Sequence, residues 1–100
     1  MKKCADTEIK ATLMAMEQCT RGSLNAHVPI ECIRSKVDES AKPVINDCLR
    51  RLKSKGYVVI HPTRNQTTYA LTRCGSHAAK KLKEEADLAI NWNERCEEDP

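Results

Sequence analysis

Residues 41–60 read AKPVINDCLRRLKSKGYVVI. Within this stretch the spacing of the apolar residues changes from that of a helix to that of a strand. In the first part of this stretch, apolar side chains recur at intervals of three and four residues, which places them on one face of a helix. These side chains are Ile45, Cys48, Leu49 and Leu52. Gly56 is suited to end the helix, and the run from Tyr57 to Ile60 has the β-branched character typical of a strand. The stretch therefore predicts a helix over about 41–55, followed at once by a strand.

The residues that follow predict a hairpin and then a long helix. Pro62 ends the first strand, residues 63–66 are polar, and residues 67–71 have the pattern of a returning strand. From Thr72 the helical spacing resumes and continues to about Cys96. One stripe of this helix carries Ala78, Leu82, Ala86, Ala89, Trp92 and Cys96. Such a helix would be ~35 Å long, which is more than a small core needs, so we expect its outer part to require a partner.

The residues that precede the central stretch predict two more helices. Apolar positions with helical spacing run through residues 6–20, and a shorter helix fits residues 29–37 after a brief extended segment at 23–28. The expected fold class is therefore α+β, with a three-helix core, a two-stranded β-hairpin and a long C-terminal helix. At 100 residues, the chain is expected to form one domain over residues 1–100.

Two stretches of the sequence resemble the winged helix-turn-helix regulators of the MarR and PadR type. Residues 33–58 are similar to the family run in which a short helix and a turn lead into a recognition helix, closing here as Leu49-x-x-Leu52-x-x-x-Gly56-Tyr57-Val58. Residues 69–82 are similar to the family's exit from the hairpin, or wing, into the next helix. That exit is written here as Tyr69-x-Leu71-Thr72-x-x-Gly75.

The resemblance implies a winged helix-turn-helix that regulates transcription by binding double-stranded DNA sequence-specifically. The recognition helix, about 41–55, would enter the major groove. The wing, about 61–68, would contact the adjacent minor groove or the backbone. Terminal helices in this family commonly form a two-fold dimer, so the resemblance also implies a homodimer through residues 76–96. The residues expected in that interface are Leu82, Ala86, Ala89 and Trp92.

Helical geometry indicates which side chains of the third helix would face DNA. The arc opposite the apolar face presents Pro43, Asn46, Asp47, Arg50 and Ser54. Asn can pair with adenine, Arg with guanine and Asp with the amino group of cytosine. Ser40, Lys42 and the open amides of the first turn are suited to a phosphate, and Arg64 at the wing tip is suited to a narrow minor groove or the backbone. Asp47 argues against DNA binding by this face, because a carboxylate that does not pair with a cytosine repels the phosphates.

The distribution of charge also favours a polyanionic partner. Residues 1–83 carry a net charge of +9, from 16 basic and seven acidic residues, whereas residues 84–100 carry seven acids and one base. The simpler alternative is a charged but solvated surface. A further alternative is a winged helix that acts as a protein–protein interaction module without contacting DNA. A positive strip joining the third helix to the wing would favour the regulator, and an exposed apolar patch there would favour the module.

The cysteines and the remaining motifs predict no further chemistry. The chain has six cysteines, which are Cys4, Cys19, Cys32, Cys48, Cys74 and Cys96. None is spaced as C-x-x-C, and Cys74-x-x-His77 has no further ligands near it, so we expect no metal site. With no secretory or membrane segment evident, a cytoplasmic location is expected, where most cysteines stay thiols unless the source is a hyperthermophile. We expect no cofactor and no enzymatic activity, because no catalytic constellation is present. Cys48 is expected to be buried. For Cys4, Cys19 and Cys96, thiol sensing is one alternative, and inert packing or a structural disulfide is the other.

Overall fold

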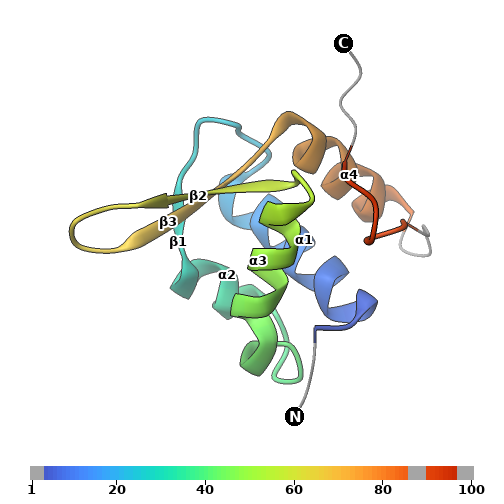
Figure 1. The fold of residues 1–100 in the computed structure, drawn as a ribbon, viewed down its shortest axis with the longest axis horizontal. Helices are drawn as coiled ribbons and strands as arrows, with labels where there is room; N and C mark the ends of the chain where they lie inside the picture. The colour runs from blue at the N-terminus through green and yellow to red at the C-terminus, as the bar shows by residue number, and fades with distance from the viewer. Residues whose placement is uncertain (1–3, 86–89, 97–100) are drawn as a thin grey trace.

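Helix α3 (Ile45–Ser54) forms within the stretch that predicts it, and strand β2 (Val58–Pro62) starts there and continues two residues beyond it. The computed structural model describes residues 4–85 and 90–96 (Figure 1). Over these residues the chain forms an α+β domain with four α-helices, one short 3₁₀ helix and a three-stranded antiparallel sheet. The other elements are α1 (Asp6–Thr20), β1 (Val28–Pro29), α2 (Ile30–Lys36), η1 (Lys42–Val44), β3 (Thr67–Leu71) and α4 (Arg73–Glu84).

The sheet has the order β1-β3-β2, so the last strand in sequence lies in the middle. Tyr69 of β3 pairs with Val28 on one side and with Ile60 on the other. Figure 1 shows the β2–β3 hairpin extending well beyond the helices to one side of the molecule. The hairpin is therefore anchored at its base, where Val58 and Leu71 are buried, and its tip is left in solvent.

The core lies between the helices and the base of the sheet. Helix α1 packs against α2, α3 and α4. The helical spacing of its apolar residues is confirmed, because Ile9, Leu13 and Met16 are all fully buried. On α3 the predicted inner face is also confirmed, with Ile45, Cys48, Leu49 and Leu52 each at most 1% exposed. Aliphatic side chains therefore make up most of this core, together with Tyr57, Tyr69 and Trp92, in a chain that has no Phe.

Two residues join the hairpin to α4. The hydroxyl oxygen of Thr72 accepts a hydrogen bond from the Gly75 N–H at 2.9 Å, which caps the helix. The same hydroxyl donates to the carbonyl of Gly56 at 2.7 Å, which ties the cap to the end of α3. Gly75 permits α4 to lie against the main chain of Tyr57, since a Cβ at this position would be 1.8 Å from the Tyr57 carbonyl oxygen.

The C-terminal helix is shorter than the sequence predicts. Helix α4 ends at Glu84, and residues 90–96 form neither helix nor strand. These residues fold back over the domain, where the Trp92 ring lies 5.1 Å from that of Tyr57 and is only 3% exposed. The Cys96 N–H donates to the Lys55 carbonyl at 2.7 Å, just after α3 ends. The prediction of a projecting helix to Cys96 is therefore wrong, because the apolar side chain of Trp92 finds its partner within the same chain.

All six cysteines are paired, which contradicts the expectation that most remain thiols. The disulfides join Cys4 to Cys48, Cys19 to Cys32 and Cys74 to Cys96, with Cα–Cα separations of 5.4, 6.2 and 6.1 Å. These separations are usual for disulfides. Cys48 is buried on the inner face of α3, as predicted. The pairing depends on contacts between distant parts of the chain, which cysteine spacing alone does not reveal.

Among the helices that the structure describes, none is both long and apolar enough to cross a membrane.

Candidate nucleic-acid interface

The outer face of α3 presents the side chains that the sequence places there. Asn46, Asp47 and Arg50 are exposed, on the side of the helix opposite its buried face. Pro43 is also exposed, but it lies in the 3₁₀ turn η1 that precedes the helix. The helix itself starts at Ile45, so the predicted helical start near residue 41 is replaced by a tighter turn leading into α3.

Two of the predicted cationic contacts are paired with acids of the same chain. The Arg50 guanidinium lies 3.6 Å from the Asp47 carboxylate, and the Lys42 ammonium lies 2.7 Å from the Glu39 carboxylate. The Arg50 and Asp47 side chains are 77% and 59% exposed, so this ion pair is weak and solvent competes for both partners. Arg50 is therefore available to an anion or a base edge, and Asp47 limits the positive charge of this face.

Ser40 lies in the turn before the helical segment and does not cap it. Its hydroxyl donates to the Asp38 carboxylate at 3.4 Å within the turn that follows α2. Neither η1 nor α3 has a side-chain cap. The amide groups at the start of this helical segment therefore have no side-chain cap, and the turn before them is exposed.

Arg64 lies in the exposed loop between β2 and β3. The loop is closed by a hydrogen bond from the Thr63 N–H to the Gln66 carbonyl at 2.8 Å, and the Thr63 hydroxyl lies against the same carbonyl. In the part of the chain that the structure describes, Arg64 forms no ion pair. The tip of the hairpin therefore offers an unneutralised cation.

Sequence reasoning missed two further cations near α3. Lys53 lies seven residues after Asn46 and three after Arg50, so it extends their stripe toward the C-terminal end of the helix. Arg95 belongs to residues 90–96, which fold back over the domain and are called the returning C-terminal segment below. Its guanidinium lies beside Gly56. Lys53 could have been found from helical spacing, whereas Arg95 depends on the fold of residues 90–96.

Two of the residues predicted to form a dimer, Leu82 and Trp92, do not lie on an exposed stripe. Leu82 is 1% exposed and Trp92 is 3% exposed, both within the core of a single chain. Ala86 and Ala89 lie outside the residues that the structure describes. The expectation of an apolar stripe carrying Leu82 and Trp92 toward a partner is therefore wrong.

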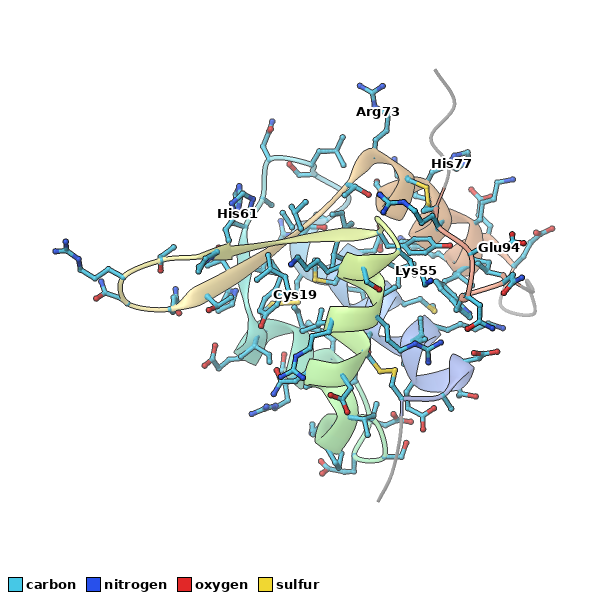
Figure 2. All side chains as sticks on the ribbon, viewed as in Figure 1. Cys19, Lys55, His61, Arg73, His77 and Glu94 are labelled. Atoms are coloured by element: carbon cyan, nitrogen blue, oxygen red, sulfur yellow. A yellow bond between two sulfur atoms is a disulfide. The ribbon has the colours of Figure 1, made fainter. Side chains whose placement is uncertain are left out.

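No cluster of three or more possible metal ligands occurs among the described residues. Cys74 is bonded to Cys96, so the Cys74–His77 spacing does not provide a thiolate and an imidazole for a metal. His27, just before β1, and His61 of β2 come together, with ring centroids 4.4 Å apart and the rings in an edge-to-face arrangement. Figure 2 shows His61 toward the hairpin and His77 on the other side of the molecule.

An open hollow lies between α4 and the returning C-terminal segment. It has a volume of about 680 Å³ and is open to solvent, with Tyr57, His77, Lys81 and Glu94 among its lining residues. Burial raises the pKa of the Tyr57 phenol above its ordinary value of 10.0, and the negative charge of Glu94 raises it further. Tyr57 therefore stays protonated at neutral pH and serves as a packing partner for Trp92.

Comparison of the chain with protein-family models, with curated proteins and with solved structures gives no match.

Proposed function

We propose that this chain is a winged helix-turn-helix protein that binds double-stranded DNA sequence-specifically and regulates transcription. The observation that supports this best is the position of α3, whose inner face is buried and whose outer face presents Asn46 and Arg50. The β2–β3 hairpin projects from the same domain with Arg64 in its loop (Figure 1). A helix and a hairpin arranged in this way can occupy a major groove and the groove beside it.

In this proposal the contacts divide into two kinds. Asn46, Asp47 and Arg50 read base edges in the major groove. Ser40, Lys42 and Pro43 lie at the start of the helical segment, near the backbone, and Arg64 enters the minor groove or contacts a phosphate. The ion pair between Arg50 and Asp47 is weak, so a guanine can replace the carboxylate as the partner of the guanidinium.

The experiment is a salt-titrated binding assay on a duplex selected from a random pool and on an unselected duplex. Arg50→Ala should cost about 1–3 kcal/mol on the selected duplex and much less on the other. Lys42→Ala should weaken binding to both duplexes nearly equally and reduce the salt slope by about one. Lys80→Ala, on α4 beside Gly22, is the control and should change neither.

Equal losses on both duplexes for Arg50→Ala would contradict base reading by α3. A wild-type protein without salt-dependent binding would instead favour the protein–protein interaction module. The exposed Val59 of β2, at 39% of its surface, would then be the first residue to test as a contact.

The homodimer stays a prediction, and its interface has to exclude Leu82 and Trp92, since the chain itself buries both. Sedimentation velocity at micromolar concentration tests it, with the mass of one or two chains as the readout. In a dimer, two recognition helices would contact half-sites about one helical turn, roughly 34 Å, apart.

We further propose that the protein is cytoplasmic in a cell that maintains intracellular disulfides, as hyperthermophiles do. Three disulfides and a DNA-binding role are compatible in such a cell. The presence of these disulfides in the cell is tested by alkylating free thiols at lysis and measuring the mass of the chain by mass spectrometry. The oxidised protein should carry no alkyl group, whereas a reduced protein would carry six.

A further inference from the structure

A shallow groove lies where the C-terminal end of α3, strand β2 and the returning C-terminal segment meet. It has a volume of about 560 Å³ and is open to solvent. Its lining residues are Lys53, Gly56, Val58, Val59, Ile60, Thr72, Arg95 and Cys96. The groove therefore combines residues from three parts of the chain, and two of these residues are cations.

Lys53 connects this groove to the outer face of α3. It follows Arg50 by three residues, so the two side chains lie on neighbouring turns of one helical face. Lys53 is exposed, and Arg95 is exposed on the other side of the groove. Within residues 4–85 and 90–96, neither cation forms an ion pair, unlike Lys42 and Arg50. Glu94 lines the neighbouring, larger hollow and is not among the residues of this groove.

Three interactions hold Arg95 at this position. Cys96 is bonded to Cys74 of α4, and its N–H donates to the Lys55 carbonyl at 2.7 Å. Trp92 is buried against Tyr57. Figure 2 shows the returning segment crossing in front of α4, close to Lys55 at the end of α3. Arg95 is thus part of an anchored segment, and its main chain is positioned before any ligand binds.

We propose that Lys53 and Arg95 form a binding site for a backbone phosphate of the same DNA duplex that α3 reads. The inference rests on the proposed function and adds to it a third contact element, residues 90–96, besides α3 and the hairpin. Arg and Lys are the side chains that most often contact phosphate oxygens, and such contacts position a protein on DNA without reading its sequence. The groove continues the stripe from Asn46 to Lys53, so it meets the backbone beside the major groove.

The disulfide makes this contact sensitive to redox state. A dithiol reductant attacks one sulfur of the Cys74–Cys96 bond, and the second thiol of the reductant then closes its own disulfide. Two electrons pass to the protein, and the two thiols of Cys74 and Cys96 take up the protons. Cys96 is only half-buried and lines both hollows, so a reductant can reach it. Reduction removes the covalent anchor next to Arg95 and weakens the phosphate contact.

The first test compares salt slopes on one unselected duplex. Arg95→Ala and Lys53→Ala should each reduce the slope by about one, and the double variant by about two. The matched controls are Arg73→Ala and Lys80→Ala, and both should leave the slope unchanged. Figure 2 shows Arg73 projecting from the start of α4, away from α3. All variants keep the acids Glu97, Glu98 and Asp99, so that only the groove changes.

The outcomes separate this inference from the proposed function. If the wild-type protein binds DNA and Arg95→Ala keeps the wild-type slope, the phosphate site is wrong while the proposed function stands. If the wild-type protein shows no salt-dependent binding at all, both are wrong. An unchanged slope for Arg95→Ala cannot arise from misfolding, since unfolding would abolish binding.

The second test examines the disulfide. Replacing both cysteines, as Cys74→Ser with Cys96→Ser, should reduce the salt slope by about one, as Arg95→Ala does. Trp92 is the only tryptophan of the chain, so its fluorescence reports directly on the returning segment. Its emission should shift to longer wavelength in the double serine variant. Wild-type fluorescence together with a wild-type slope would overturn the role of the disulfide.

Discussion

Gly75 lets α4 lie against the main chain of Tyr57. A Cβ at residue 75 would lie 1.8 Å from the Tyr57 carbonyl oxygen, and that oxygen is fixed because it accepts the Thr72 N–H at 3.1 Å. Neither backbone can move without breaking the helix cap, so Gly75→Ala should destabilise the fold by about 3 kcal/mol or more. Urea unfolding measures the change, with His77→Ala on the exposed side of α4 as control. Equal midpoints for the two variants would disprove the close contact.

The phenol of Tyr57 makes the stability of the fold depend on pH in the alkaline range. Burial, with Glu94 as a second cause, raises its pKa above 10.0 in the folded chain. The unfolded chain therefore loses this proton at a lower pH than the folded chain does. The contribution to stability is complete below pH 10.0 and is lost as the pH rises through the folded pKa.

Tyr57→Phe tests this pH dependence because it keeps the ring that packs on Trp92. The free energy of unfolding of the wild-type protein should fall more steeply between pH 9 and pH 11 than that of the variant. Parallel pH profiles for the two proteins would show that Tyr57 ionises equally in both states.

The returning segment, residues 90–96, is an element held by one large side chain. Trp92 fills a site against Tyr57, and its indole N–H is buried without a hydrogen-bond partner among the described residues. Trp92→Ala should therefore cost about 3–5 kcal/mol. Trp92→Phe should cost clearly less, since it keeps a ring and removes the unpaired N–H. Denaturant unfolding of both variants measures this, and similar losses would argue against the packing described here.

The position of Trp92 also decides what a charge at this residue does. If Trp92 lay on a projecting helix in a dimer interface, a charge there would produce a folded monomer. With Trp92 in the core, Trp92→Glu should instead lower the melting temperature strongly. The two alternatives are told apart by circular dichroism, because only the first preserves the thermal transition.

The elements that the sequence predicts well are those whose apolar pattern is satisfied locally. Helix α1 matches residues 6–20, and β3 matches residues 67–71, because Ile9, Leu13 and Tyr69 follow the periods of a helix and a strand. The motif Thr72-x-x-Gly75 also has a physical explanation for each of its two residues. The threonine caps α4, and the glycine permits contact with Tyr57.

The C-terminal segment could not be predicted in the same way. Trp92 continues the helical stripe of Leu82, so the pattern alone favours a longer helix. The bond between Cys74 and Cys96 and the contact between Trp92 and Tyr57 depend on tertiary structure, and local periodicity contains no information about them. For the same reason Arg95 was missed as a candidate contact, although Asn46, Arg50 and Arg64 were placed correctly on the surface.

The whole molecule is cross-linked at both ends. Cys4 is joined to the inner face of α3, and the Arg51 guanidinium donates to its carbonyl at 2.7 Å. The bonds close stretches with separations of 44, 13 and 22 residues. Each typically stabilises a domain by about 2–4 kcal/mol, with longer loops contributing more. Opening Cys4–Cys48 by Cys4→Ser with Cys48→Ala should therefore lower the melting temperature more than the corresponding change at Cys19 and Cys32. Calorimetry at matched pH checks the order.

The arrangement of these bonds also determines how the chain responds to force. The bond between Cys4 and Cys48 encloses the one between Cys19 and Cys32, and the third lies apart, so residues 49–73 are outside every covalent ring. A pull on the two ends passes through the sulfur bridges and can lengthen mainly the stretch from Cys48 to Cys74. At ~3.5 Å per residue this stretch extends to ~90 Å, against ~350 Å for the reduced chain. Optical tweezers should thus record a short extension that comes almost entirely from the C-terminal half of α3 and the hairpin, while the two disulfide-linked parts of the chain do not lengthen.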